Sequence, residues 1–166
     1  MHTNKSSNQH GFTLIELLLV IGIIAALAVS VYVALNPSQR IKDAQDARRT
    51  TDVDTILSAI HSSIVDNKGT LPTNLSAAGT TEKQLGTAVT GCALATGGCG
   101  AVADGDCINL APTGAAGLGK YLKTIPMDPK NGTAALTKYT VQVDANGLVT
   151  VRSCSADSTT NISASR

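Results

Sequence analysis

Aromatic residues are scarce in this chain of 166 residues, which has one Phe, three Tyr and no Trp. Base-stacking platforms and aromatic ligand cages are therefore not expected. Charged residues make up 15% of the chain, against roughly 25% in a typical soluble protein. The formal net charge is only +1, which argues against a general nucleic-acid binder, because such proteins are usually strongly basic.

Histidine is also scarce. Of His2, His10 and His61, only His61 lies beyond the first eleven residues, so a His-rich metal or catalytic centre is not expected. The sequence also shows no Ser/His/Asp set, Gly-rich phosphate loop or paired-carboxylate cleft. We interpret these absences as the mark of a protein that is not an enzyme and that has no cofactor.

The apolar residues are concentrated in one run over residues 12–35, which reads FTLIELLLVIGIIAALAVSVYVAL. A helix of this length would rise roughly 36 Å, enough to cross the hydrocarbon of a bilayer. A buried core helix is the alternative, but few other large apolar residues are present to surround it. The run therefore predicts a membrane-spanning helix over residues 12–35.

A short polar segment, MHTNKSSNQHG, precedes this run. A secretory signal would have the reverse order, with a short apolar core before a small-residue cleavage site. Glu16 lies inside the run, where a carboxylate is energetically costly and indicates a functional site with a partner. The alternative is a residue near the membrane interface that is protonated or that reaches water.

The order Gly11-Phe12-Thr13-Leu14-Ile15-Glu16 followed by an apolar helix resembles the class III signal of type IV pilins and pseudopilins. The resemblance implies that a prepilin peptidase removes residues 1–11 by cutting between Gly11 and Phe12, and that it N-methylates Phe12. In a filament, the new amine of one subunit would pair with the Glu16 carboxylate of a neighbour, because each charge alone would be uncompensated.

Residues 36–68 are expected to form an amphipathic helix. Pro37 marks a break, interpreted here as one helix bent or locally melted, with a second helix beginning at Pro37 as the alternative. Lys68-Gly69 is expected to end the helix. One apolar stripe has helical spacing and contains Val53, Ile56, Leu57, Ile60 and Ile64. The mixed charges are expected to form a solvated face, with DNA contact as an alternative for the basic residues Arg40, Lys42, Arg48 and Arg49.

Residues 69–166 are expected to form a globular head. Asn146-Gly147 is a strong turn signal between two alternating segments, which predicts a β-hairpin over about residues 137–153. Short helices are expected over residues 81–89, where Thr81 to Gln84 reads as a capping box, and over residues 116–123. The last residues, 161–166, are expected to be frayed. The segment Ile125-Pro126-Met127-Asp128-Pro129 resembles a Leu-Pro-x-Asp-Pro-type loop that precedes the first strand in pseudopilins and in Gram-positive-like pilins.

Four cysteines without a C-x-x-C pair indicate two disulfides in an oxidising compartment. Of three pairings, Cys92–Cys99 and Cys107–Cys154 are preferred, as a local clip and a longer staple. A zinc site with His61 and free buried thiols are the alternatives. Some pseudopilins bind calcium in this region, which makes Asp104 and Asp106 calcium candidates, although EF-hand spacing is missing.

Together these features predict an α+β pilin fold, with a long N-terminal helix packed on a small head that contains an antiparallel β-hairpin. The expected function is that of a structural subunit of a type IV pilus, which would serve adhesion, motility or DNA uptake. The alternatives are a pseudopilin of a type II secretion or competence system, and an anchored single-span protein that does not polymerise. The expected partners are other copies of the chain, the prepilin peptidase, and the pilus assembly platform with its ATPase. The precursor would lie in the cytoplasmic membrane with its head outside, before moving into an extracellular filament.

Overall fold

The computed structural model describes residues 11–101, 103, 105, 107–110, 117–157 and 161–166. The chain divides into two compact units, Met1–Arg40 and Ile41–Arg166. The leader predicted over residues 1–11 lies outside the described residues except for Gly11.

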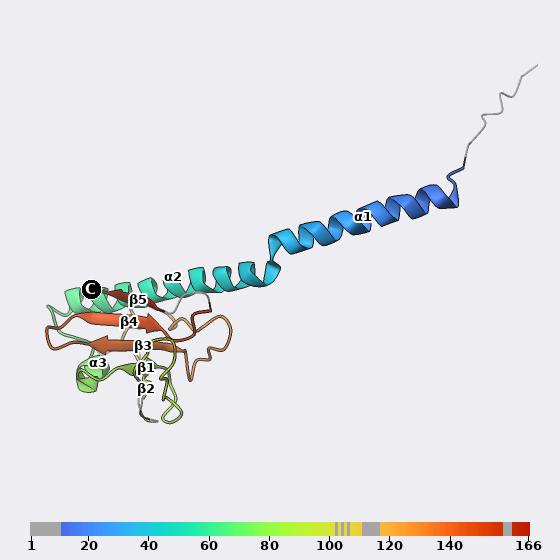
Figure 1. Cartoon of the computed structure of the whole chain (residues 1–166). Helices are drawn as coiled ribbons and strands as arrows, with labels where there is room; N and C mark the ends of the chain where they lie inside the picture. Colours follow the sequence, from blue (N-terminus) through green and yellow to red (C-terminus); the bar gives the residue numbers. More distant parts are fainter. Residues whose placement is uncertain (1–10, 102, 104, 106, 111–116, 158–160) are drawn as a thin grey trace, which may run out of the picture. The chain divides into compact units, whose positions relative to one another are not determined.

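The first unit contains helix α1, Leu14–Leu35 (Figure 1). Thr13 is its N-cap, and a capping box joins the Thr13 side chain to the backbone of Glu16 while the Glu16 side chain reaches back to Thr13. The helix ends at Asn36, whose backbone is left-handed with φ 39° and ψ 67°. Asparagine tolerates this conformation better than most residues, so Asn36 is a natural stop for α1.

Helix α2, Pro37–Asp66, begins directly after this stop. Pro37 occupies the first position of α2, where its missing N–H costs no helical hydrogen bond. The predicted break near Pro37 is therefore present, but as the start of a second helix rather than as a bend within one. Lys68 and Gly69 both have positive φ, and the Gly69 N–H donates to the Ile64 carbonyl at 2.8 Å, which ends the helix as expected.

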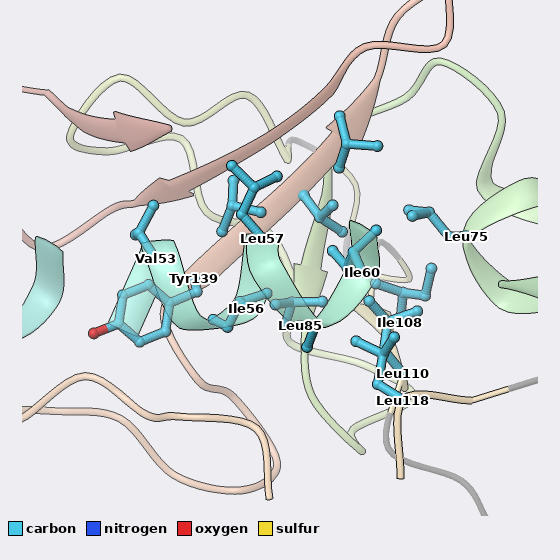
Figure 2. Packing of buried hydrophobic residues seen from close by; sticks show 14 of the residues in the cluster. Val53, Ile56, Leu57, Ile60, Leu75, Leu85, Ile108, Leu110, Leu118 and Tyr139 are labelled. Atoms are coloured by element: carbon cyan, nitrogen blue, oxygen red, sulfur yellow. The ribbon is translucent and has the colours of Figure 1, made fainter. Parts of the chain in front are cut away.

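The apolar stripe of α2 is buried, as its helical spacing predicted (Figure 2). Ile56 and Ile60 have no exposed surface, and Ile64 is partly buried against the same core. The prediction of a solvated charged face was wrong for Asp46 and Arg49, because both are buried. The core of the second unit also contains Leu75, Leu85, Ile108, Leu110, Leu118, Tyr139, Val141, Val143, Val149, Val151 and Ile162.

The second unit contains a five-stranded sheet in the order β2-β1-β3-β4-β5. Strands β3, Tyr139–Val143, and β4, Val149–Ser153, form the predicted hairpin. Its turn is closed by the Asp144 carboxylate, which accepts hydrogen bonds from the N–H groups of Asn146 and Leu148 at 2.8 Å. Strand β1, Lys83–Leu85, pairs with β3 antiparallel and with β2, Cys107–Ile108, in parallel. A short helix α3, Thr73–Ala78, precedes the sheet.

Three local predictions were wrong. The segment predicted as a helix over residues 81–89 contains strand β1, because Glu82 is drawn into tertiary contacts and Leu85 is fully buried. In the predicted helix over residues 116–123, the described part is a turn in which Tyr121 and Leu122 both donate to the Leu118 carbonyl. The segment expected to be frayed forms strand β5, Ile162–Ser165, which pairs antiparallel with β4.

The four cysteines form two disulfides, but the preferred pairing was wrong: the bonds are Cys92–Cys107 and Cys99–Cys154. The sheet register explains the difference. Cys107 lies beside Gln84 in the β1–β2 pair, and the Gln84 side-chain amide donates to the Cys92 carbonyl at 2.9 Å, which brings Cys92 to Cys107. All four thiols are consumed, so the free-thiol and zinc alternatives do not apply.

Candidate functional site

The predicted processing site is accessible at the start of the described chain. Gly11 and Phe12 lie before α1 and are exposed, Phe12 by 89%. The Glu16 carboxylate accepts hydrogen bonds from the Thr13 N–H at 2.9 Å and from the Thr13 hydroxyl at 2.8 Å. Within a single chain, therefore, the carboxylate is satisfied by the residue three positions before it.

Every residue of α1 is exposed, although the helix is almost entirely apolar. By length and composition, the described chain contains one helical stretch that could span a membrane, at the N-terminal side of Leu14–Asp66. An exposed apolar surface of this extent needs a lipid or protein environment. Helix α1 therefore has the properties of a membrane anchor or of a helix that packs against other subunits.

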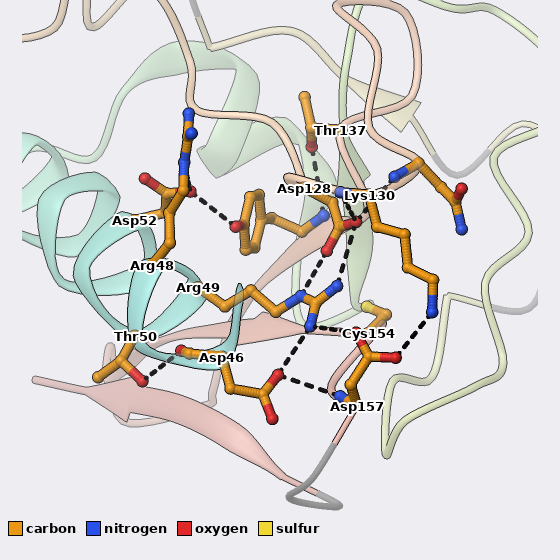
Figure 3. Close-up of polar contacts among 12 residues, drawn as sticks. Asp46, Arg48, Arg49, Thr50, Asp52, Asp128, Lys130, Thr137, Cys154 and Asp157 are labelled. Atoms are coloured by element: carbon orange, nitrogen blue, oxygen red, sulfur yellow. Dashed lines mark hydrogen bonds and ion pairs between the residues drawn. The ribbon is translucent and has the colours of Figure 1, made fainter. Parts of the chain in front are cut away.

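A buried charge cluster lies in the second unit, around Arg49 (Figure 3). The Arg49 side chain has no exposed surface, and its Nε donates to Asp128 Oδ2 at 2.6 Å. Its Nη1 donates to Asp46 Oδ1 at 2.7 Å and to Asp157 Oδ2 at 2.8 Å. Helix α2, the loop before β3 and the segment after β4 therefore meet at one guanidinium. We call Arg49, Asp46, Asp128 and Asp157 the Arg49 cluster.

The backbone also holds Asp128 in place. Its Oδ1 accepts the N–H groups of Lys130 and Asn131, each at 3.0 Å, and its own N–H donates to the Thr137 carbonyl at 2.9 Å. This holds the carboxylate of the Ile125–Pro129 segment against the Arg49 guanidinium. The sequence analysis identified the Ile125–Pro129 segment by its resemblance to a pilin and pseudopilin loop. It did not indicate that Asp128 pairs with α2.

The electrostatics of the Arg49 cluster favour the charged forms. Burial disfavours the charge on Arg49, but the hydrogen bonds to the three carboxylates outweigh it, so the pKa of the guanidinium is raised. For Asp128, burial would raise the pKa, but the hydrogen bonds from Arg49 and from two backbone N–H groups keep that pKa below its ordinary value. Lys130 and then Arg49 lower the pKa of Asp157. Arg49 is thus paired with all three carboxylates of the cluster.

A signal for the burial of Arg49 was present in the sequence. Arg49 precedes Val53 by four residues, so it lies on the same helical stripe as the buried apolar positions. Asp46, one turn earlier, is a natural helical partner. The DNA alternative fails for Arg49 because its guanidinium is fully paired and buried, whereas Arg40, Lys42 and Arg48 remain exposed.

Another buried carboxylate, Glu82, lies outside the Arg49 cluster and beside the disulfide Cys99–Cys154. It accepts hydrogen bonds from the Gly100 N–H at 2.8 Å, from the Thr140 hydroxyl at 2.5 Å and from Arg152 Nη1 at 3.0 Å. The Thr140 hydroxyl also lies 3.3 Å from the Cys99 sulfur. These contacts join the loop that contains Cys99 to strands β3 and β4.

The weaker site predictions receive no support as metal ligands. Asp104 and Asp106, the calcium candidates, lie outside the described residues. Among the residues that are described, no group of three or more His, Cys, Asp or Glu side chains could hold a metal ion. The Nε2 of His61 lies in hydrogen-bond contact with the Arg166 carbonyl oxygen, at 3.0 Å.

Comparison with known families matches residues 6–32 to the prokaryotic N-terminal methylation motif. Curated proteins and solved structures gave no match to the chain. The matched segment includes Gly11, Phe12, Glu16 and most of α1. The motif fits a membrane-anchored precursor that is processed by a prepilin peptidase. The chain therefore carries the class III signal peptide of type IV pilins and pseudopilins, on a structure consistent with the α+β pilin fold.

Proposed function

We propose that this chain is the structural subunit of a type IV pilus and that it has no catalytic role. The observation that carries the proposal is the position of the methylation motif. It lies at the N-terminal end of a helix whose apolar surface is exposed over its whole length. A lone membrane anchor needs such a helix but not the motif, whereas a filament subunit uses both. Adhesion, motility or DNA uptake would be properties of the assembled fibre.

In this proposal the prepilin peptidase cuts between Gly11 and Phe12 and methylates the new amine of Phe12. Assembly then replaces the contact between Glu16 and Thr13 with an ion pair between Glu16 and the Phe12 amine of a neighbouring subunit. Because the surroundings are apolar, an unpaired charge on either group is unfavourable, and this selects one register between subunits. The assembly platform and its ATPase would supply the energy for extraction from the membrane.

Intact mass and N-terminal sequencing of protein sheared from cells test the proposal. We expect a chain that starts at N-methylated Phe12, with a mass lowered by four hydrogens for the two disulfides. A chain that still begins at Met1 and stays in the membrane fraction would contradict it. A plain anchored protein that does not polymerise would then be the better account.

A pseudopilin of a type II secretion or competence system is the second candidate. The loop Ile125–Pro129 resembles a segment of pseudopilins and equally of Gram-positive-like pilins, so it does not separate the two candidates. Both candidates undergo the same processing, so the length of the fibre separates them. Long filaments on the cell surface at native expression indicate a pilin. A processed subunit that remains in the cell envelope indicates a pseudopilin.

A further inference from the structure

The two disulfides of the head interleave along the chain. The bonds are Cys92–Cys107 and Cys99–Cys154, so Cys99 lies within the span of the first bond and Cys107 within the span of the second. All four cysteines are described, and none is bonded to the cysteine nearest to it in the sequence. To reach this pairing, each cysteine has to bypass its closest possible partner.

Loop length favours other pairings in the unfolded chain. Cys99 lies seven positions after Cys92 and eight before Cys107, whereas the native bonds join cysteines 15 and 55 positions apart. Because the entropic cost of closing a flexible loop rises with the logarithm of its length, Cys92–Cys99 should close roughly threefold more often than Cys92–Cys107. By the same relation, Cys99–Cys107 should close roughly fifteenfold more often than Cys99–Cys154. Both short bonds consume Cys99, so either one leaves Cys154 without its native partner.

The folded head separates Cys92 from Cys99. Leu94 and Ala101 form an antiparallel bridge, and Cys99 lies inside the loop that this bridge closes, while Cys92 lies before it. A chain in which Cys92–Cys99 forms first must therefore break that bond to reach the native pairing.

The contacts that select the native pairs come from distant segments. In the β1–β2 pair, Gln84 lies beside Cys107, and the Gln84 amide donates to the Cys92 carbonyl at 2.9 Å. The Thr96 hydroxyl donates to the Cys154 carbonyl at 3.2 Å across 58 positions. These contacts require the sheet and the segment after β4. They are absent while the chain is unfolded, when the short loops are already free to close.

We propose that this chain is a substrate of a thiol–disulfide isomerase. Its early bonds include Cys92–Cys99 and Cys99–Cys107, and exchange with the isomerase thiol converts them into the native pairs. Exchange has to act before the head closes, because Cys92, Cys99 and Cys154 are buried in the folded head and an attacking thiolate must reach the sulfur. It involves the second unit alone and does not depend on filament assembly.

The exchange needs no net oxidation. In a chain paired as Cys92–Cys99 and Cys107–Cys154, the isomerase thiolate attacks the Cys99 sulfur, forms a mixed disulfide and releases the Cys92 thiolate. Cys92 then attacks the Cys107 sulfur, which forms the first native bond and releases the Cys154 thiolate. Cys154 attacks Cys99 in the mixed disulfide, which forms the second native bond and returns the isomerase thiolate. One bond breaks for each bond that forms.

Oxidative refolding of the full chain in detergent micelles tests the proposal. The reduced chain is diluted from urea into diamide, an oxidant that supplies no thiol, or into reduced and oxidised glutathione with protein disulfide isomerase. Digestion without reduction, after Leu94 by chymotrypsin and before Asp104 by endoproteinase Asp-N, separates the three neighbouring cysteines for mass spectrometry. With diamide alone, we expect native pairing in roughly one in five molecules, the share that the loop lengths give. Exchange should raise this share at least about threefold.

Cys99→Ser/Cys154→Ser is the matched control. It retains only Cys92 and Cys107, which cannot mispair within the chain, so the yield of their bond should be equal under both conditions. If this variant does not fold, Cys92→Ser/Cys107→Ser, which retains the other native pair, takes its place.

Two results would overturn the proposal. One is a native share in the parent that is equal under both conditions, because folding would then align the cysteines before oxidation joins them. The other is an equal gain in the parent and in the control, because the thiols would then assist oxidation or folding in general rather than exchange between pairs.

Discussion

At the scale of single residues, the buried charge of Arg49 depends on its carboxylate partners. A guanidinium without exposed surface is tolerated here because three carboxylates from different parts of the chain receive its N–H groups. Removing one partner leaves part of a buried charge uncompensated, which is more damaging than the loss of an exposed ion pair. The cluster therefore joins α2 to the head through charge as well as through apolar packing.

We predict that Asp128→Asn lowers the free energy of unfolding of the head by about 3–5 kcal/mol, the range for breaking a buried pair. The double variant Arg49→Met/Asp128→Leu should lose less than the two single changes added together, because both charges leave at once. Urea unfolding of the chain in micelles measures both. Lys120→Met, which removes an exposed ion pair with Asp66, is the control and should change little. A loss below about 1 kcal/mol for Asp128→Asn, the level of an exposed pair, would contradict the prediction.

The lowered pKa of Asp128 and Asp157 predicts a direction for the pH dependence. The folded state binds the proton more weakly than the unfolded state, so these groups contribute their full stability above the ordinary Asp value of about 3.9. That contribution is lost progressively as the pH falls from there through the folded pKa. Thermal unfolding between pH 7 and pH 2 should show this loss in the parent and a smaller loss in Asp128→Asn. Equal losses in both would show that Asp128 is not the group concerned.

Glu16 is the residue on which filament assembly is proposed to depend. We expect Glu16→Ala to reduce the yield of sheared filaments by at least about tenfold, because the amine of a neighbouring Phe12 loses its partner. Unfolding of the head should not change, since the Glu16 side chain is exposed and its hydrogen bonds among the described residues go to Thr13. Thr13→Val removes the hydroxyl but leaves the carboxylate, and it is the matched control. A normal filament yield from Glu16→Ala would contradict the proposed assembly mechanism.

At the scale of elements, the disulfides hold the head together where secondary structure is sparse. Cys92–Cys107 closes a sequence separation of 15 and Cys99–Cys154 one of 55. In the chain-entropy model, these loops correspond to about 3 and about 4 kcal/mol of stabilisation respectively. The longer bond also joins the loop to the end of β4, next to the buried Glu82.

We therefore expect the double change Cys99→Ser/Cys154→Ser to lower the melting temperature of the head more than Cys92→Ser/Cys107→Ser. Differential scanning calorimetry of the two variants and the parent provides the comparison, and peptide mapping without reduction confirms which bond remains. The reverse order would mean that packing around Cys92, which is fully buried, outweighs loop entropy.

At the scale of the whole molecule, the two units differ in what stabilises them. All residues of the apolar core lie in the second unit, from Val53 onwards, whereas α1 has no buried residue. The second unit thus contains its own core, its own sheet and both disulfides. Helix α1, in the first unit, needs an apolar environment.

We predict that residues 41–166, produced in an oxidising compartment, fold as a soluble monomer with both disulfides and a cooperative thermal transition. The full chain should require detergent, because α1 is apolar and none of its residues is buried in the part of the chain that the structure describes. Size-exclusion chromatography and circular dichroism of the two proteins check this. A head that is unfolded or aggregated without α1 would show that the helix contributes to its stability.

Much of this architecture follows from local pattern. The apolar run determined α1, the helical stripe determined which side of α2 is buried, and the Asn146-Gly147 turn determined the β3–β4 hairpin. These features depend on periods of a few residues, so they can be read without knowing the rest of the fold. The motif around Glu16 is local as well and is the part that the family comparison matches.

Only the tertiary structure decided the partners of Arg49, the disulfide pairing and the strands β1 and β5. Arg49 meets Asp128 across 79 positions, and a carboxylate so distant leaves no periodic signal near α2. Strands β1 and β5 are short and become strands by pairing with β3 and β4, against a local preference for a helix or for no structure. The sequence by itself thus determined which segments are apolar or regular. The burial of particular charges and the pairing of distant residues depended on tertiary contacts. Those contacts form only when the sheet and its loops pack against α2.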